Sequence, residues 1–120
     1  MTAAFAVVSI LAKSQPYADD ARQFHDQVEA SLNRAGWQTR REVRVDGYRG
    51  TGGRSGFLDL VATDPHGGVL VAIELDRLNP RRKSLAKLAA YVGADRLVVL
   101  RCKRALYVAN CIAGGGMEGR

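Results

Sequence analysis

The sequence predicts an α/β fold, a sandwich of element order αβββαβ in which a central mixed β-sheet is flanked by helices. Two observations carry this prediction: helical periodicity over residues 18–34 and 81–92, and short apolar segments of strand composition between and after them. The first three strands can meander as antiparallel neighbours. The fourth, reached through a helical crossover, can lie parallel to the third.

The chain has 120 residues, which suits one domain with one modest core. We expect this domain over residues 1–113 and a flexible tail over 114–120. The apolar segment Ala3–Leu11 is either a strand or a short helix, and it lacks the basic start and cleavage site of a signal peptide. No segment is long enough to span a membrane, and no His–Cys cluster suggests zinc. A reduced, cytoplasmic setting without a membrane partner is expected.

Residues 18–34 form the first expected helix. Its apolar positions recur at helical spacing: Ala21, Phe24, Val28, Leu32 and Ala35. Asp19 and Asp20 stand at the expected N-terminus, where acidic side chains favour the helix dipole. Gly36 suits the position just after the last turn, so the helix is expected to end there.

Residues 37–45 then alternate in the manner of a strand. The side chains expected to share one side are Trp37, Thr39, Arg41, Val43 and Val45. Residues 47–56 contain five glycines and are expected to form a loop. This is not a phosphate-binding P-loop, because it lacks the Gly-Lys-Ser/Thr ending and leads into a strand.

A hairpin is expected from Gly56–Thr63 and Val69–Asp76, each of which carries an acid in an apolar run. If the loop between them is symmetric, Val61 faces Ala72 and Asp59 faces Glu74. Directly opposed side chains share a sheet face, and like charges opposed there are destabilising. An apolar setting makes each charge costlier, so a bound divalent cation is the simplest compensation.

Residues 81–92 form the second expected helix. The side chains expected in its core stripe are Leu85, Leu88, Ala89 and Val92. Residues 97–100 are fully apolar, as expected of a buried strand. Residues 105–112 fit a strand or a helix equally well.

The charge distribution favours a nucleic-acid partner. The net charge is +6 and the sequence pI is about 9.8. Residues 77–104 hold nine Lys or Arg and only one acid, whereas acids gather at Asp59, Asp64, Glu74 and Asp76. A basic surface that frames a small acidic centre suits a polyanion whose backbone must reach a metal. The plainer interpretation is an ordinary basic protein with a solvated surface.

Asp59 and Glu74, with the backbone carbonyl of Leu75 and waters, form a suitable site for a hard cation. Mg²⁺ is expected there, with Mn²⁺ as a substitute. Such an ion polarises a phosphoryl oxygen and lowers the pKa of a bound water. Asp76 could support these ligands or be a third one, but a role in capping the next loop or pairing with Arg77 or Arg81 fits it better.

Over residues 21–100 the chain resembles the PD-(D/E)XK nuclease superfamily, which has the restriction-endonuclease-like fold. The resemblance rests on the element order, on Gly36 and Trp37 after the first helix, and on residues 41–43, 57–60 and 72–76. Carried over, Asp59 and Glu74 match the two metal-binding acids. The family lysine, two residues after the second acid, is Asp76 here, which is a departure from the pattern.

The missing lysine has a candidate replacement on the second helix, where Lys83, Lys87 and Tyr91 form one stripe. Residues 87–91 resemble a Gln-x-x-x-Tyr element of RecB-like members, with Lys in place of Gln. The resemblance implies Lys87, or else Lys83, as the catalytic group that stabilises developing charge, and Tyr91 as a nucleic-acid contact. Solvated lysines at such positions are the alternative.

Other family positions are less well matched. The acids available on the first helix are Asp20, Asp26 and Glu29, none of which fits well, and His25 with Glu29 is a weak pair. Glu42 matches a family acid of the first strand. It either supports the metal ligands or pairs with Arg40 or Arg44.

Phosphate contacts are expected from Arg49 and Arg54 in the glycine-rich loop and from Arg81 and Arg82 at the start of the second helix. Tyr48 could stack on a base. A solvated turn is the alternative for the loop.

Together these observations predict a metal-dependent nuclease that hydrolyses phosphodiester bonds, with DNA endonuclease activity as the first expectation. The alternative is a catalytically inactive nucleic-acid-binding module or subunit of the same fold. A third class is a protein-interaction subunit that needs a partner for targeting. Small nucleases of this kind often form homodimers, but the sequence shows no clear interface.

Overall fold

The protein is described by a computed structural model that covers residues 2–48, 56–101 and 106–109. The element bounds are α1 Ala3–Ser14, α2 Ala21–Arg34, β1 Gln38–Val45, β2 Gly56–Thr63, β3 Leu70–Asp76, α3 Arg82–Ala90, β4 Asp95–Leu100 and β5 Leu106–Ala109. Arg49, Arg54 and the expected tail 114–120 lie outside the described residues.

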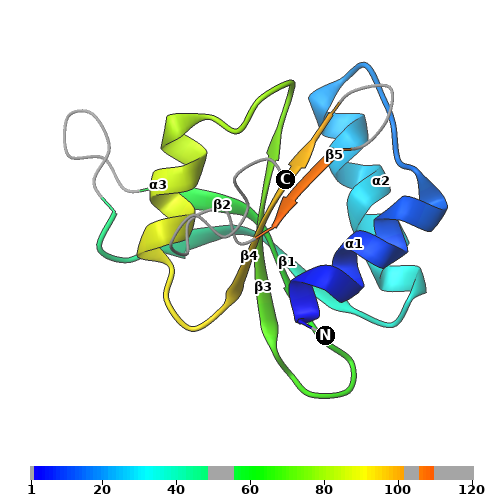
Figure 1. The fold of residues 1–120 in the computed structure, drawn as a ribbon, viewed down its shortest axis with the longest axis horizontal. Coiled ribbons are helices and arrows are strands. Elements are labelled where there is room, and N and C mark those ends of the chain that lie inside the picture. The colour runs from blue at the N-terminus through cyan, green and yellow to red at the C-terminus, as the bar shows by residue number, and fades with distance from the viewer. Residues whose placement is uncertain (1, 49–55, 102–105, 110–120) are drawn as a thin grey trace.

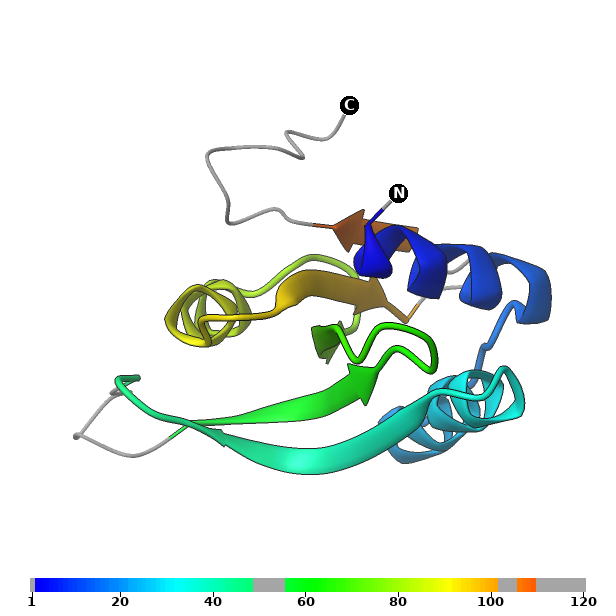
Figure 2. The same ribbon diagram turned by 90° about the horizontal axis from the view of Figure 1, so that it is seen from below.

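The five strands form one mixed sheet in the order β1-β2-β3-β4-β5. Strand β4 is parallel to β3, and the other neighbouring pairs are antiparallel. Helices α1 and α2 lie on one side of the sheet and α3 lies on the other (Figures 1 and 2). The expected α/β class and the parallel fourth strand are therefore confirmed, with an additional N-terminal helix and a fifth strand.

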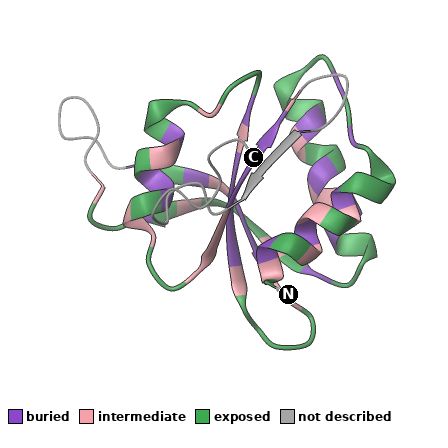
Figure 3. Ribbon diagram, viewed as in Figure 1, coloured by how far each residue is buried: buried purple, intermediate pink, exposed green. Residues whose placement is uncertain are grey.

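The core has two parts, one on each face of the sheet, and the strands between them are largely buried (Figure 3). On the α1/α2 side, Phe24, Val28 and Leu32 of α2 meet sheet residues such as Leu60 and Ile73. On the α3 side the buried set is Val45, Leu58, Val61, Ala72, Leu88, Val98 and Leu100. Each face of β3 is thus covered by helices.

Helix α1 resolves the open question at the N-terminus. Thr2 caps it, because its Oγ1 accepts the N–H of Phe5 at 3.1 Å. Ala4, Val7 and Leu11 are fully buried at helical spacing. For residues 105–112, the strand alternative is confirmed at residues 106–109, which form β5.

Helix α2 begins three residues later than expected. Asp20 is its N-cap and accepts the N–H of Arg22 at 2.6 Å, so the first turn starts at Ala21. Ala21 and Ala35 are exposed, which corrects the expected core stripe at its two ends. Gly36, with φ +93°, adopts the left-handed conformation that ends the helix.

Alternation along strand β1 is interrupted. The five side chains that were expected on one side of this strand therefore do not all lie on that side. Arg41 and Thr39 contact α2 through Glu29, whereas Val43 and Val45 belong to the core under α3. The switch occurs at Glu42, whose φ is +54°. The β1–β2 ladder runs through Arg41↔Leu60 and Val43↔Leu58 and omits the level between them.

Helix α3 is rotated relative to the expected core stripe. Ala89 is exposed and Val92, beyond the end of the helix, is 79% exposed. The buried residues of the helix are instead Ser84, Lys87 and Leu88. Two of these three side chains are polar, so specific partners on the sheet must orient the helix. No helix in the described ranges has the length and apolarity to cross a membrane.

The conformation of Glu42 generates a testable prediction. A non-glycine residue in the left-handed region costs roughly 1–2 kcal/mol, so Glu42→Gly should stabilise the protein by up to about 1 kcal/mol. Arg40→Gly, in extended backbone of the same strand, should destabilise it instead. Urea denaturation of both variants checks this, and equal destabilisation by both would contradict the assigned backbone.

Candidate active site

The candidate site is a fork between β2 and β3. The predicted register is confirmed by the pairs Val61↔Ala72 and Thr63↔Leu70, and the ladder ends at Leu60↔Ile73. Beyond that level β2 stays paired with β1, and β3 stays paired with β4. Asp59 and Glu74 are the next facing positions, so they stand where the two strands separate.

Each acid fills the gap left by the missing ladder. The N–H of Asp59 donates to Oε2 of Glu74 at 2.7 Å, and the N–H of Leu75 donates to Oδ2 of Asp59 at 2.8 Å. Strand N–H groups point toward the neighbouring strand, so both carboxylates lie between the strands. Asp59 is partly exposed and Glu74 is fully buried.

The two side chains do not share a sheet face, which corrects the prediction drawn from their opposed register. Asp59 lines a pocket on the α2 side of the sheet. Glu74 contacts Lys87 of α3 on the opposite side. They meet in the fork because the missing ladder leaves room there.

Lys87 is held deep in the same fork. It is 6% exposed, its Nζ lies 2.7 Å from Oε1 of Glu74, and it donates to the carbonyl of Phe57 at 2.9 Å. The contact with Oε1 is an ion pair without good hydrogen-bond geometry. Lys83, one turn earlier, is exposed and outside the fork. Of the two lysines proposed from the sequence, the structure brings only Lys87 to the acids.

Gly56 explains how Lys87 can lie so close to β2. A Cβ atom at this position would be 2.4 Å from the Tyr48 ring and 3.1 Å from Cδ of Lys87. The half-buried Tyr48 packs against the α3-side core, so its ring serves packing here.

The electrostatics of the fork centre on Glu74. Burial, and after it the charge of Asp59, raise its pKa to about 7 against the opposing effects of Lys87 and the Asp59 N–H. A carboxylate with such a pKa is poorly compensated by its present neighbours. An additional positive charge in the fork would favour its ionised form.

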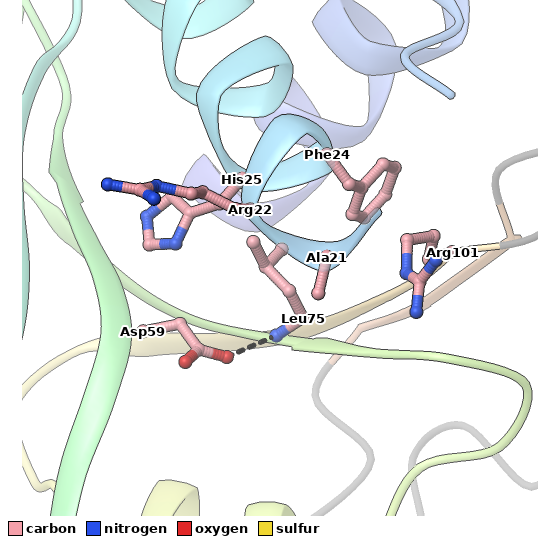
Figure 4. A pocket seen from close by; sticks show the side chains of 7 residues that line it. All are labelled: Ala21, Arg22, Phe24, His25, Asp59, Leu75 and Arg101. Carbon is pink, nitrogen blue, oxygen red and sulfur yellow. Dashed lines mark hydrogen bonds between the residues drawn. The ribbon is translucent and has the colours of Figure 1, made fainter. Parts of the chain in front are cut away.

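The pocket beside Asp59 has a volume of about 200 Å³ and opens between α2 and the sheet (Figure 4). The residues that line it are Ala21, Arg22, Phe24, His25, Asp59, Leu75 and Arg101. The guanidinium of Arg101 donates to the carbonyls of Ala18 and Asp19, just before α2. The buried Nε2 of His25 has no hydrogen-bond partner among the described residues. His25 is only a weak candidate from the sequence and Arg101 is not a candidate at all, because neither belongs to a recognisable motif.

Asp76 is not a member of the fork. Its buried carboxylate accepts the N–H of Arg81 at 2.8 Å, Nε of Arg81 at 3.1 Å and the hydroxyl of Ser84 at 2.8 Å. Both oxygens are therefore engaged at the start of α3. Capping and pairing with Arg81, the better-fitting roles from the sequence, are what the structure shows.

The remaining candidate acids come from β1 and α2. Glu42 is exposed. Asp26 and Glu29 bind Arg41 at 2.7 and 2.6 Å. The hydrogen bond from Arg41 lowers the pKa of Asp26. Burial raises the pKa of Glu29, but the hydrogen bonds from Thr39 and Arg41 outweigh it and leave that pKa below its ordinary value.

Of the expected nucleic-acid contacts, Arg81 and Arg82 are exposed around the start of α3. Tyr91 is half-buried against the α3-side core, and its N–H donates to the carbonyl of Lys87 at 3.2 Å. Within the described part of the chain, no group of three or more His, Cys, Asp or Glu side chains is placed to hold a metal ion. No family model, curated protein or solved structure matches the chain.

The raised pKa of Glu74 predicts a pH dependence of stability. Between its ordinary pKa of 4.5 and about 7 the folded state binds more protons than the unfolded state. The contribution of Glu74 is therefore fully present below pH 4.5 and is lost as pH rises through 7. The whole effect is at most about 3 kcal/mol.

Urea denaturation in EDTA across this pH range measures the effect. The quantity compared is the free energy of unfolding of the wild type minus that of Glu74→Gln. As pH rises, the wild type should lose stability relative to Glu74→Gln, so this difference should fall. The change with pH should be smaller in the presence of Asp59→Asn, because this substitution removes the charge that raises the pKa of Glu74. A difference that stays constant with pH would contradict the assignment.

The ion pair generates a second prediction. At pH 8, Lys87→Met should destabilise the protein by about 3 kcal/mol, because it leaves a buried carboxylate without its partner. Adding Glu74→Gln should recover much of this loss. Lys83→Met, an exposed position of the same helix, is the matched control and should change stability little. Additive effects of the two fork substitutions would exclude a direct pair.

Proposed function

We propose that this protein is a Mg²⁺-dependent nuclease that hydrolyses phosphodiester bonds in nucleic acid, with DNA as the expected substrate. The observation that carries the proposal is the fork itself. Two carboxylates from neighbouring strands and one buried ammonium converge where the sheet opens. Ordinary sheet interiors avoid such a group of charges because each must be desolvated.

The donor set fits a hard divalent cation. The carboxylates of Asp59 and Glu74, with the backbone carbonyl of Leu75, are the oxygen ligands that Mg²⁺ accepts, and waters would complete its shell. Within the described residues, Oε1 of Glu74 is buried without a hydrogen bond of good geometry, and the pKa of Glu74 is about 7. When bound, the ion would polarise a phosphoryl oxygen and make a bound water more acidic.

The chain's own groups support the same chemistry. The ammonium of Lys87 is anchored by Glu74 and by the carbonyl of Phe57, so it is pre-oriented toward charge that develops beside the acids. Asp59 faces a pocket, through which a phosphate can reach it from the α2 side. The net charge of +6 favours approach of a polyanion.

The proposal also accounts for the departure at Asp76. In the PD-(D/E)XK pattern a lysine would occupy this strand position. Here Asp76 fixes the start of α3, and Lys87 on that helix supplies the ammonium. The resemblance to this superfamily therefore remains part of the proposal, with the lysine moved from strand to helix.

A second candidate is a nucleic-acid-binding module of the same fold without catalysis. One observation favours it: in the described residues only two acids meet at the fork, and no third His, Cys, Asp or Glu completes a metal-holding group. Under this alternative the fork is a structural feature, and the basic residues bind nucleic acid independently of metal.

A cleavage assay separates the two. With Mg²⁺ or Mn²⁺ the wild type should cleave DNA, supplied as plasmid, short duplex or single strand, and EDTA should abolish this. Asp59→Asn, Glu74→Gln and Lys87→Met should each lower the rate by about 10²-fold or more. Binding of DNA by Lys87→Met should stay near the wild-type level.

The matched controls are Asp46→Asn and Lys83→Met, whose side chains are exposed and outside the fork. They should cleave at nearly the wild-type rate. Cleavage that survives removal of either fork carboxylate would exclude the metal site. Binding that is insensitive to metal, with no cleavage by any preparation, would favour the second candidate.

A further inference from the structure

The first residues of β2 carry an aromatic ring that the core does not use. Phe57 is 45% exposed, although its neighbours Gly56 and Leu58 are buried. A single exposed aromatic residue is ordinary on a protein surface. Phe57 differs in its position, because it lies two residues from Asp59 and its own carbonyl accepts the hydrogen bond from Lys87.

Phe57 faces the same side of the sheet as the pocket beside Asp59. Leu58 and its partner Val43 belong to the core under α3, so alternation turns Phe57 and its partner Arg44 toward the α2 side. The start of β2 and the end of β1 extend beyond α2 (Figure 2), and the 45% exposure of Phe57 agrees with this. Two residues of strand span about 7 Å, which places the ring within one nucleotide of Asp59.

Arg44 completes this surface. It is directly opposite Phe57 in the β1–β2 ladder, and its side chain is 61% exposed. Its contact with Asp46 is long, at 4.0 Å, and Asp46 is fully exposed, so the guanidinium is available to a ligand. An aromatic face beside a guanidinium suits a nucleobase and the phosphate attached to it.

We infer that Phe57 and Arg44 form a stacking platform for an unpaired nucleobase next to the phosphate bound at the fork. This inference rests on the proposed function and specifies its substrate class: nucleic acid with a single-stranded or unpaired nucleotide at the site. A base inside a duplex is stacked on both sides and cannot offer its face to the ring. The backbone of Phe57, held by β1 and by Lys87, pre-organises the platform.

Fluorescence anisotropy in EDTA tests the platform without cleavage. The probes are a labelled oligothymidylate and an abasic oligomer of the same length, which offers the same phosphates and no bases. Wild type should prefer the base-bearing oligomer by about 5- to 150-fold, the range expected for one stacked base. Phe57→Ala should lose most of this preference, and Phe57→Tyr should keep it.

The matched control is Phe5→Ala, because Phe5 is 52% exposed on α1 and belongs to no candidate site. It should retain the preference. Arg44→Gln should weaken binding of both oligomers and reduce the salt dependence. Thermal unfolding of each variant verifies folding before binding is compared.

A base preference that is absent in wild type, or unchanged in Phe57→Ala, would overturn the platform and leave the nuclease proposal to the cleavage assay. Loss of preference in Phe57→Ala alone, in a protein that never cleaves, would support the platform and reject the nuclease. Failure of the wild type to bind either oligomer would likewise overturn the platform and leave the nuclease proposal to the cleavage assay.

Discussion

The separation of β2 from β3 is the constraint on which the rest of the structure depends. Where the ladder ends, the N–H groups of Asp59 and Leu75 lose the carbonyl partners that a continuous sheet would provide. Buried backbone donors without acceptors are costly, and here the carboxylate of the opposite strand accepts each of them. The two acids are therefore part of what permits the fork, whatever further chemistry they perform.

The fork also determines where α3 lies. Asp76, at the end of β3, binds Arg81 and Ser84 at the beginning of the helix, and Glu74 binds Lys87 near its end. Leu88 is the one fully buried apolar side chain among the described residues of α3. The helix is thus oriented by two polar contacts with one strand more than by an apolar stripe. This arrangement ties the position of the ammonium to the strand that carries its carboxylate partner.

The sequence was most informative where a single periodicity decides the structure. The hairpin register followed from a symmetric loop, and a shift by one residue would turn every side chain of the strand to the other face. The core of α2 followed from helical spacing. By contrast, Ala89 and Val92 were placed in the core of α3 because periodicity counts apolar residues and cannot see the contacts of Ser84 and Lys87. Polar orientation of a helix depends on partners distant in sequence.

The errors at the site have a common physical origin. Glu42, Asp59 and Glu74 occupy one level across three strands, by continuation of the two registers. At this level both ladders are interrupted, Glu42 adopts a positive φ, and Glu74 has a raised pKa. Regular alternation predicted a shared face for the acids because it assumes an unbroken sheet. Several costly local features are thus concentrated at one level of an otherwise regular sheet, and this concentration is the reason to propose a functional site there.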